Sequence, residues 1–179
     1  MAADPHRFFA PDYAAARAAF LGAARRRGAA IASHPIRARG PRGEELAVDT
    51  AWLGPDQPRD VLLVTSGVHG VEGFAGSALQ RHLLEDDFSV APHVGLLLVH
   101  AVNPWGFAHL RRVNESNVDL NRNFLRHPDE HVANPDYDLL YDAVNPDRLD
   151  ADSEAVQLAA LLDFAAAHGG PRLQAALSR

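Results

Sequence analysis

An apolar run that stops at a glycine-rich turn is the feature that most restricts how this chain can fold. Residues 60–66 read DVLLVTS, and so short a β-branched run predicts a strand buried on both faces. After the turn, GFAGSALQRHLLEDD predicts a helix and HVGLLLVHAVNP predicts a second buried strand. A strand, a helix and a strand in this order form a parallel crossover unit, so we expect an α/β protein.

The rest of the chain supplies further elements around this unit. A helix is expected from about Asp12 to Arg27, with Gly28 suited to its C-terminal cap. We expect two further strands in residues 29–40 and 44–54, and two further helices in residues 135–144 and 152–170. The predicted fold class is therefore α/β, with a mixed, partly parallel sheet flanked by helices. In the crossover helix, one apolar face is predicted, made of Ala75, Ala78, Leu79, His82 and Leu83.

Two absent residue types narrow the possible chemistry. The chain has no cysteine and no lysine, and its 17 basic residues are all arginine. Disulfides, thiolate ligands, cysteine nucleophiles and Schiff-base chemistry are thereby excluded. The formal net charge of −6 argues against a nucleic-acid partner, and the sequence has no apolar run of membrane-spanning length. With no secretory signal pattern at its start, the chain is predicted to be cytoplasmic.

The glycine-rich turn carries two ionisable side chains, His69 and Glu72, directly after the first apolar strand. Ligands bind at the carboxyl ends of parallel strands, and imidazole and carboxylate groups are usual zinc ligands. Two of the three protein ligands of a catalytic zinc could therefore come from this turn. The alternative is that Glu72 only favours a helix N-terminus and that His69 is incidental. The glycine spacing does not suit a dinucleotide site, and Ser66 lacks the setting of a nucleophile elbow.

A second polar segment, HLRRVNESNVDLNRNF, spans residues 109–124 and is rich in arginine and asparagine. Arginine forks bind carboxylates in a bidentate manner, and neighbouring amides add directional donors. The alternative is a solvated loop with surface ion pairs. Between the two segments, NPWGF follows the second strand and predicts a turn at the same sheet edge as His69.

Taken together, SGVHGVEGFAGSA, NPWGF and RRVNESNVDLNRNF resemble the zinc carboxypeptidase superfamily. The closest likeness is to its DUF2817 branch, which is similar to the succinylglutamate desuccinylase and aspartoacylase group. The resemblance implies that His69 and Glu72 are zinc ligands and that Arg112 polarises the scissile carbonyl. It also implies that Asn121 and Arg122 hold a free carboxylate of a small peptide or acyl-amino-acid substrate. The implied activity is zinc-dependent hydrolysis of an amide or peptide bond near that carboxylate.

The same resemblance implies further functional residues that these three motifs do not contain. The family's third zinc ligand and general base come from later strands, and His127, His131 and His168 are weak substitutes. Residues 1–179 are therefore expected to be one N-terminal portion of a zinc-carboxypeptidase-like domain, inactive alone and with an open sheet edge that favours self-association. The alternative function is a non-catalytic module that binds a carboxylate-bearing peptide or metabolite.

Overall fold

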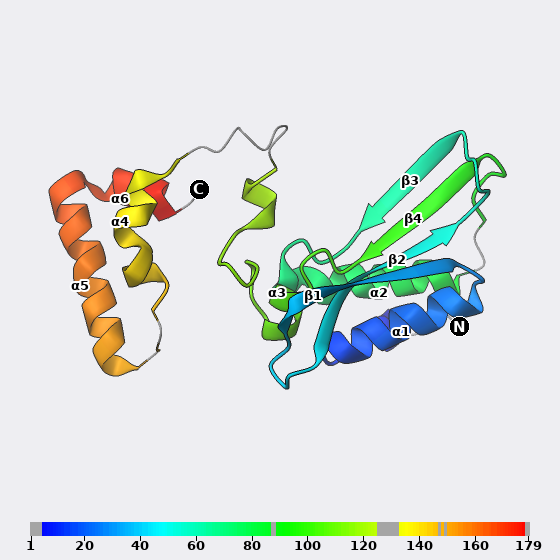
Figure 1. Ribbon diagram of the computed structural model, residues 1–179, viewed down its shortest axis with the longest axis horizontal. Helices are drawn as coiled ribbons and strands as arrows, with labels where there is room; N and C mark the ends of the chain where they lie inside the picture. The colour runs from blue at the N-terminus through cyan, green and yellow to red at the C-terminus, as the bar shows by residue number, and fades with distance from the viewer. Residues whose placement is uncertain (1–4, 87–88, 125–132, 147, 149, 178–179) are drawn as a thin grey trace. The chain divides into compact units, whose positions relative to one another are not determined.

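The computed structural model describes residues 5–86, 89–124, 133–146, 148 and 150–177 (Figure 1). The chain divides into two compact units, one ending at Asn123 and the other beginning at Phe124. The interpretation of the chain as part of one catalytic domain stays a prediction.

The first unit is a four-stranded mixed sheet with helices. Its helices and strands are α1 (Tyr13–Arg26), β1 (Ala30–Arg39), β2 (Glu45–Leu53), β3 (Asp60–Thr65), α2 (Gly73–Glu85), β4 (Val94–His100) and α3 (Pro104–His109), with single 3₁₀ turns η1 (Pro5–Phe8), η2 (Gly70–Glu72) and η3 (Leu120–Arg122). The strand order is β1-β2-β4-β3, in which β3 and β4 are parallel and the other pairs are antiparallel. The predicted fold class and the predicted parallel pairing are confirmed.

Helix α1 begins and ends where its sequence predicts. Asp12 caps the N-terminus, since its carboxylate accepts a hydrogen bond from the Ala15 N–H at 2.8 Å. Arg25 and Arg26 lie in the last turn, where positive charge is favoured by the helix dipole. Gly28 follows with a φ of +73°, a conformation that glycine adopts readily. Local sequence alone therefore defines this element.

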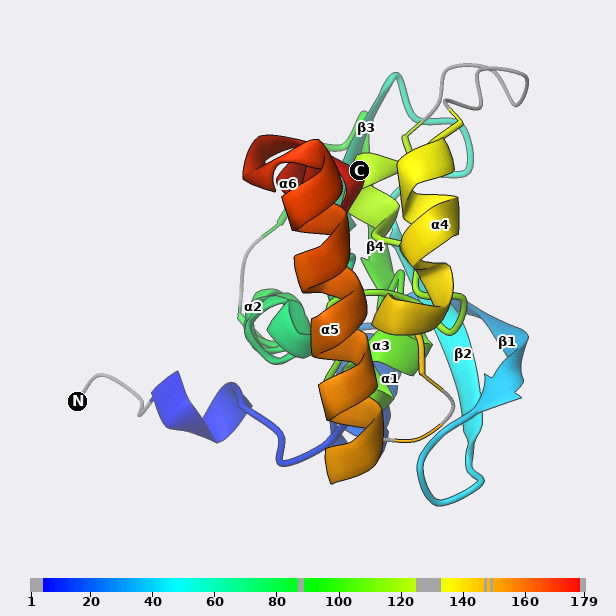
Figure 2. The same ribbon diagram turned by 90° about the vertical axis from the view of Figure 1, so that its left-hand side faces the viewer.

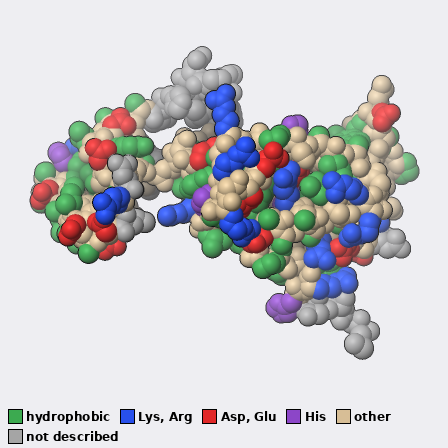
Figure 3. All heavy atoms as spheres, turned by 60° about the horizontal axis from the view of Figure 1, so that its bottom comes forward, with side chains coloured by type: hydrophobic (Ala, Val, Ile, Leu, Met, Phe, Trp, Pro, Cys, Tyr) green, Lys and Arg blue, Asp and Glu red, His purple; other side chains and the backbone are tan. Residues whose placement is uncertain are grey.

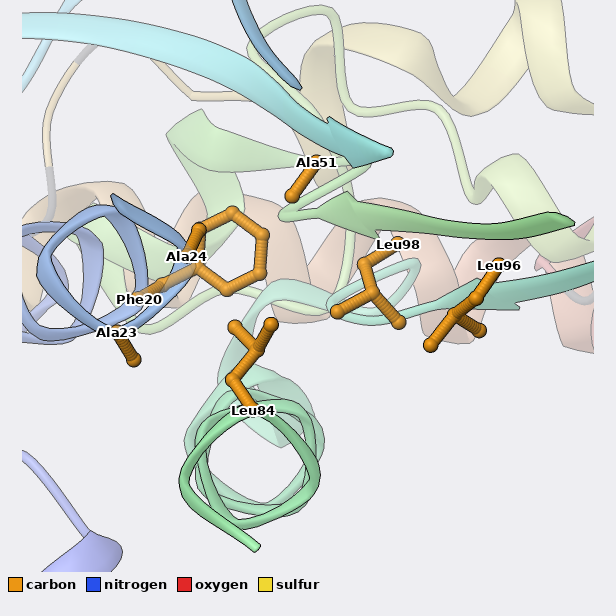
Figure 4. Close-up of a cluster of buried hydrophobic side chains, with 7 residues drawn as sticks. All are labelled: Phe20, Ala23, Ala24, Ala51, Leu84, Leu96 and Leu98. Atoms are coloured by element: carbon orange, nitrogen blue, oxygen red, sulfur yellow. The ribbon is translucent and has the colours of Figure 1, made fainter. Parts of the chain in front are cut away.

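Helices α1 and α2 lie against one face of the sheet, and the main core forms between them and the strands (Figures 1 and 4). Phe20 and Leu84 point from the two helices toward Leu96 and Leu98 of β4 (Figure 4). All four are almost fully buried. A second cluster, around Phe107, joins α1 and α3 to the sheet. These clusters hold the carboxyl ends of β3 and β4 in place.

The prediction that residues 60–66 form a strand buried on both faces is wrong. Val61, Leu62 and Leu63 are 55%, 51% and 56% exposed, because β3 is the edge strand of the described sheet. The buried parallel strand is β4, which lies between β2 and β3. An apolar run indicates that burial of the strand is favourable. Whether the strand is buried depends on its position in the sheet.

The predicted apolar face of α2 is also wrong in most positions. Leu79 is 69% exposed and His82 is exposed, whereas the polar Ser77 and Gln80 are buried. Gln80 donates hydrogen bonds to the Val64 and Val99 carbonyls and accepts one from Ser66. Ser77 hydrogen-bonds with His100 at 2.9 Å. Ser77 and Gln80 therefore lie on the inward face of α2, because hydrogen bonds to buried partners compensate for the burial of their polar groups.

The second unit consists of three helices, α4 (Pro135–Val144), α5 (Ala151–His168) and α6 (Gly170–Leu177), which lie side by side in two views (Figures 1 and 2). Its core contains Leu140, Phe164 and Ala176. Asp150 and Ser153 form a capping box at the start of α5. Gly169 and Gly170 predict the end of the last helix, so the sequence does not predict the separate helix α6. Among the described residues, no helix is both long and apolar enough to cross a membrane.

Candidate metal and carboxylate site

The turn that carries His69 is built at the carboxyl end of β3. Gly67 has a φ of +65°, and its carbonyl accepts from the Asn103 N–H after β4. At Gly70, an added Cβ would lie 1.9 Å from the carbonyl carbon of Gly106. The turn therefore packs directly on the backbone of α3, which only glycine allows. This contact places His69 and Glu72 at the edge where both parallel strands end.

His69 lies between two carboxylates. Its Nδ1 is 3.2 Å from Glu72 Oε1, and its Nε2 is 3.0 Å from Asp119 Oδ1. The His69 side chain is 10% exposed and the Glu72 side chain is 65% exposed. A neutral imidazole can donate from only one of its nitrogens. When Nε2 donates to Asp119, the Nδ1 lone pair therefore lies on the Glu72 side, where it is available to a ligand.

Asp119 is the carboxylate that organises this cluster. Burial by itself raises the pKa of Asp119, but hydrogen bonds from Arg112, His69 and the Asn121 N–H outweigh burial, so the pKa lies below its ordinary value. Asp119 is thus an anion near neutral pH. A carboxylate that accepts from one imidazole nitrogen fixes the ring and makes the other nitrogen a better metal ligand.

Arg112 extends the cluster on the exposed side. Its Nε donates to Asp119 Oδ2 at 2.9 Å, and its NH1 lies 3.9 Å from Glu72 Oε1. The segment that carries it is held by buried Asn103, whose side-chain amide donates to the Val113 carbonyl at 2.9 Å. The Arg111 carbonyl accepts from the Val71 N–H at 3.1 Å. The turn after β4, for which a plain connection was the alternative, therefore positions Arg112 beside His69.

The other two predicted site residues, Asn121 and Arg122, closely follow Asp119 in the sequence but contribute less to the cluster. Asn121 contributes its backbone N–H, which donates to Asp119 Oδ1 at 2.9 Å. Arg122 is exposed, and its NH1 donates to the Asn121 carbonyl at 3.4 Å. The structure thus brings His69, Glu72 and Arg112 together, whereas the carboxylate-binding roles of Asn121 and Arg122 stay predictions.

Two of the predicted ligands fit a zinc ion. Two ligands of one tetrahedral zinc lie about 3.3 Å apart, since each is about 2.0–2.1 Å from the metal. The separation of 3.2 Å between His69 Nδ1 and Glu72 Oε1 is close to this value. Within the described ranges, however, no group of three His, Cys, Asp or Glu side chains could hold a metal. The cluster therefore offers two side chains of zinc-ligand type beside a carboxylate that contacts one of them, and their role as ligands stays a prediction.

Three further histidines are the weaker candidates for a third ligand. His127 and His131 lie outside the described residues. His168 ends α5 in the second unit, where its ring lies 4.6 Å from that of Phe164. A role of these histidines at the metal stays a prediction.

Sequence reasoning missed Asp119 and understated Asn103. Asp119 lies 50 positions from His69, so no local spacing links the two. One signal is present in the sequence: Asp119 is the acidic residue of the segment VDLNRNF, which also contains the predicted site residues Asn121 and Arg122. Asn103 could have been suspected from Asn-Pro after a buried strand, where an asparagine side chain caps a following helix.

Fold and site together define a class: a mixed α/β protein with a histidine–carboxylate–arginine cluster at the carboxyl edge of its parallel strands. The chain belongs to the family described as "Protein of unknown function (DUF2817)", whose model matches residues 9–179. This result confirms the predicted branch, while the link to zinc carboxypeptidases stays a prediction. No curated protein matches the chain.

The chain is similar over part of its length to solved structures of glutaminyl cyclases from several organisms. The Fimbriiglobus ruber enzyme is 18% identical with a TM-score of 0.39, over 55% of this chain and 45% of that one. The Macrostomum lignano enzyme is 16% identical with a TM-score of 0.37, over 48% and 30%. The Tannerella forsythia enzyme is 15% identical with a TM-score of 0.36, over 71% and 53%. The matches span about half of these enzymes or less, and likenesses this distant carry no inference about activity.

Proposed function

We propose that this protein contributes to zinc-dependent hydrolysis of an amide or peptide bond near a free carboxylate. The observation that carries the proposal is the chain of contacts from Glu72 through His69 to Asp119 and Arg112. It joins two zinc-ligand types, an orienting carboxylate and a cation at one sheet edge. The substrate class is a small peptide or an acyl-amino acid.

Each residue of the cluster has a distinct role in this proposal. His69 and Glu72 would hold the ion, and Asp119 keeps the His69 ring oriented through Nε2. Bound zinc lowers the pKa of its water and polarises a carbonyl. Arg112 is half-exposed beside Glu72, so its guanidinium can meet the oxygen on which negative charge develops. Arg122 and Asn121 would bind the free carboxylate of the substrate.

The described residues leave two parts of such a mechanism unassigned, namely a third ligand and a general base. A positioned acid or base typically contributes about 10²–10⁴-fold to rate. The isolated chain is therefore expected to bind zinc weakly and to show little hydrolysis.

The test of the metal role is a calorimetric zinc titration, and the chain contains its own matched control. His82 and Glu85 repeat the spacing of His69 and Glu72, but Glu85 is held by Arg81 and Arg26. We expect His69→Ala/Glu72→Ala to abolish zinc binding and His82→Ala/Glu85→Ala to retain it. Equal binding by both variants would show that the cluster holds no zinc and is only a network of side-chain contacts.

A second candidate function is binding of a carboxylate ligand without turnover. The exposure of Arg112 and Arg122 at the cluster favours it, because a bidentate carboxylate needs accessible guanidinium groups. Titration with an N-acetylated amino acid, with and without zinc, separates the two functions. Zinc-dependent hydrolysis favours the enzyme, whereas zinc-independent binding that Arg122→Gln removes, without turnover, favours the module.

A further inference from the structure

Gln80 of α2 is a buried amide that contacts both parallel strands near their carboxyl ends. Only 1% of the residue is exposed. Its amide nitrogen donates to the Val64 carbonyl of β3 at 2.9 Å and to the Val99 carbonyl of β4 at 3.1 Å. Its amide oxygen accepts from the Ser66 hydroxyl at 2.9 Å. Carbonyl oxygens only accept hydrogen bonds, so the two strand ends need a side chain with two N–H donors, which an amide supplies.

Helix α2 approaches the strand ends closely enough for this contact because of Gly76. An added Cβ at Gly76 would lie 2.7 Å from the Ser66 Cβ. Gly76 and Gln80 are four positions apart, so they lie on the same face of the helix. The helix therefore touches the end of β3 at Gly76, and Gln80 bridges the two strands about one turn further along.

The Val99 carbonyl is the acceptor at which Gln80 joins the sheet. It accepts from the Ser66 N–H at 3.0 Å, and it also accepts from Gln80 of α2. Soon after this point the two turns begin, and the Asn103 N–H donates to the Gly67 carbonyl at 2.8 Å. Gln80 therefore fixes α2 to the sheet at the level from which both turns leave it.

The two strands that Gln80 bridges carry different halves of the candidate site. The turn after β3 carries His69. The turn after β4 carries Asn103, whose side chain holds the segment of Arg112, and Arg112 in turn donates to Asp119. The contact of 3.0 Å between His69 and Asp119 therefore depends on how the end of β3 is placed relative to the end of β4.

We propose that Gln80 is a positioning residue of this site, which sets the place of the His69 ring relative to Asp119 by bridging the two strand ends. It also fixes α2 to the strand that leads to His69, and Glu72 directly precedes that helix. The inference rests on the proposed metal role only where zinc is concerned, since the contact between His69 and Asp119 forms without a metal. Gln80 itself touches neither substrate nor ion.

Gln80→Met separates this role from simple burial, because methionine fills similar space but has no N–H group. Tyr13→Phe is the matched control. Tyr13 is 2% exposed, and its hydroxyl donates to the Ala47 carbonyl and accepts from the Ala47 N–H, both at 2.9 Å. Each change removes two hydrogen bonds to strand backbone in the first unit, so urea unfolding should show a loss of stability in both variants.

The ring nitrogens of His69 report its position without a metal. In a neutral imidazole only one nitrogen carries the proton, and nitrogen NMR distinguishes the two forms. Asp119 is nearer to the ring than Glu72 and less exposed, so at alkaline pH the wild type should carry the proton on Nε2. Gln80→Met should move part of the population to Nδ1, whereas Tyr13→Phe should match the wild type. The spectrum of His69→Gln assigns the signals.

An unchanged proton population in Gln80→Met would overturn the proposal and leave Gln80 with a structural role only. If Gln80→Met does not fold, Ser66→Ala removes one of the three hydrogen bonds. It should give a smaller change in the same direction, and the absence of any change would count equally against the proposal.

A calorimetric zinc titration of the same variants extends the test to the metal. Gln80→Met should lower zinc affinity by about 10-fold, and Tyr13→Phe should leave it unchanged. A wild type that binds no zinc would refute the proposed metal role, while the NMR comparison would still decide the positioning role. Equal zinc affinity of the wild type and Gln80→Met would overturn the role of Gln80 at the metal.

Discussion

Two pairs of histidine and glutamate with the same spacing lie 13 residues apart, and only one of them forms a candidate metal site. His69 and Glu72 belong to the turn after β3, where the His69 ring contacts both Glu72 and Asp119. His82 and Glu85 lie on α2, where the His82 ring packs 4.7 Å from the Phe8 ring. Spacing therefore only permits a metal site, and the partners brought from elsewhere in the chain decide which pair forms one.

The two glutamates differ in their cations. Glu85 accepts from Arg81 Nε at 2.9 Å and from Arg26 NH2 at 3.3 Å. The hydrogen bond from Arg81 is the largest cause that lowers the pKa of Glu85, and the charges of Arg81, Arg26 and Arg7 add to it against the effect of burial. Arg112 NH1 lies 3.9 Å from Glu72 Oε1, and the same oxygen lies 3.2 Å from His69 Nδ1. The Glu72 carboxylate therefore faces the His69 ring, whereas the Glu85 carboxylate is ion-paired with two arginines.

The largest expected difference between the two histidine–glutamate pairs comes from adding a methyl group at Gly70. A Cβ there would meet the Gly106 backbone at 1.9 Å, so the His69 turn must move while the His82 helix does not. We expect Gly70→Ala to lower the free energy of unfolding by about 3 kcal/mol or more. Trp52 and Trp105 both lie in the first unit, so urea unfolding followed by tryptophan fluorescence measures this loss.

Gly22→Ala, in helix α1 of the first unit, is the matched control for this prediction. The heavy atom nearest to the added Cβ outside the helix backbone is the flexible end of the Arg26 side chain, at 3.4 Å. Stability should then be unchanged or slightly increased. An equally small effect at Gly70 would contradict the close packing of the turn on α3.

A third histidine, His100, sharpens the comparison because it is buried without a carboxylate partner for its ring. Burial lowers the pKa of the His100 imidazole to about 4, against the opposing effect of Asp49, and Arg17 lowers it further. The folded state therefore favours the neutral ring. The contribution of the neutral His100 ring to the free energy of unfolding is fully present above the ordinary pKa of 6.5, and it is lost as the pH falls from there toward 4.

We expect this loss to be on the order of 3 kcal/mol, since one pKa unit corresponds to about 1.4 kcal/mol. The measurement is urea unfolding at several values between about pH 7 and pH 4, for the wild type and for His100→Gln. The variant should show a smaller decrease over this range, whatever its stability at neutral pH. If the free energy of unfolding decreased equally with pH in the two proteins, burial of neutral His100 would not be the cause of the loss.

The smallest expected effect is on zinc affinity, and it comes from Asp119, which contacts His69 and has no counterpart described at His82. Asp119→Asn removes the anion that orients His69 and should lower zinc affinity by about 10–100-fold. Glu85→Gln alters the other pair and should leave zinc affinity unchanged. Calorimetric titration of both variants checks this, and unchanged affinity in Asp119→Asn would remove Asp119 from the site.

Local sequence predicted those parts of the fold that depend on local interactions. Helix α1 has its own cap and its own final arginines, and the parallel crossover follows from an alternation of strand, helix and strand. His69, Glu72 and Arg112 could be selected from motifs, and the structure does bring them together. Burial of β3 and the inward face of α2 could not be predicted, because each depends on elements distant in the chain.

The surface of the first unit shows the same limit. In Figure 3, arginine and acidic side chains are interspersed on its visible face rather than gathered by sign. The total charge is a property of the sequence, but its distribution depends on which elements lie side by side.

The sequence by itself determined that this chain is an α/β protein with a histidine and a glutamate in a turn at the end of an apolar strand. Only the tertiary structure decided that Asp119 meets His69 across 50 residues, that Asn103 places Arg112 there, and that β3 lies open at the edge. The physical reason is that strand and helix preferences act over a few neighbouring residues. Hydrogen bonds and burial, by contrast, are satisfied by whichever groups the packed chain brings into contact.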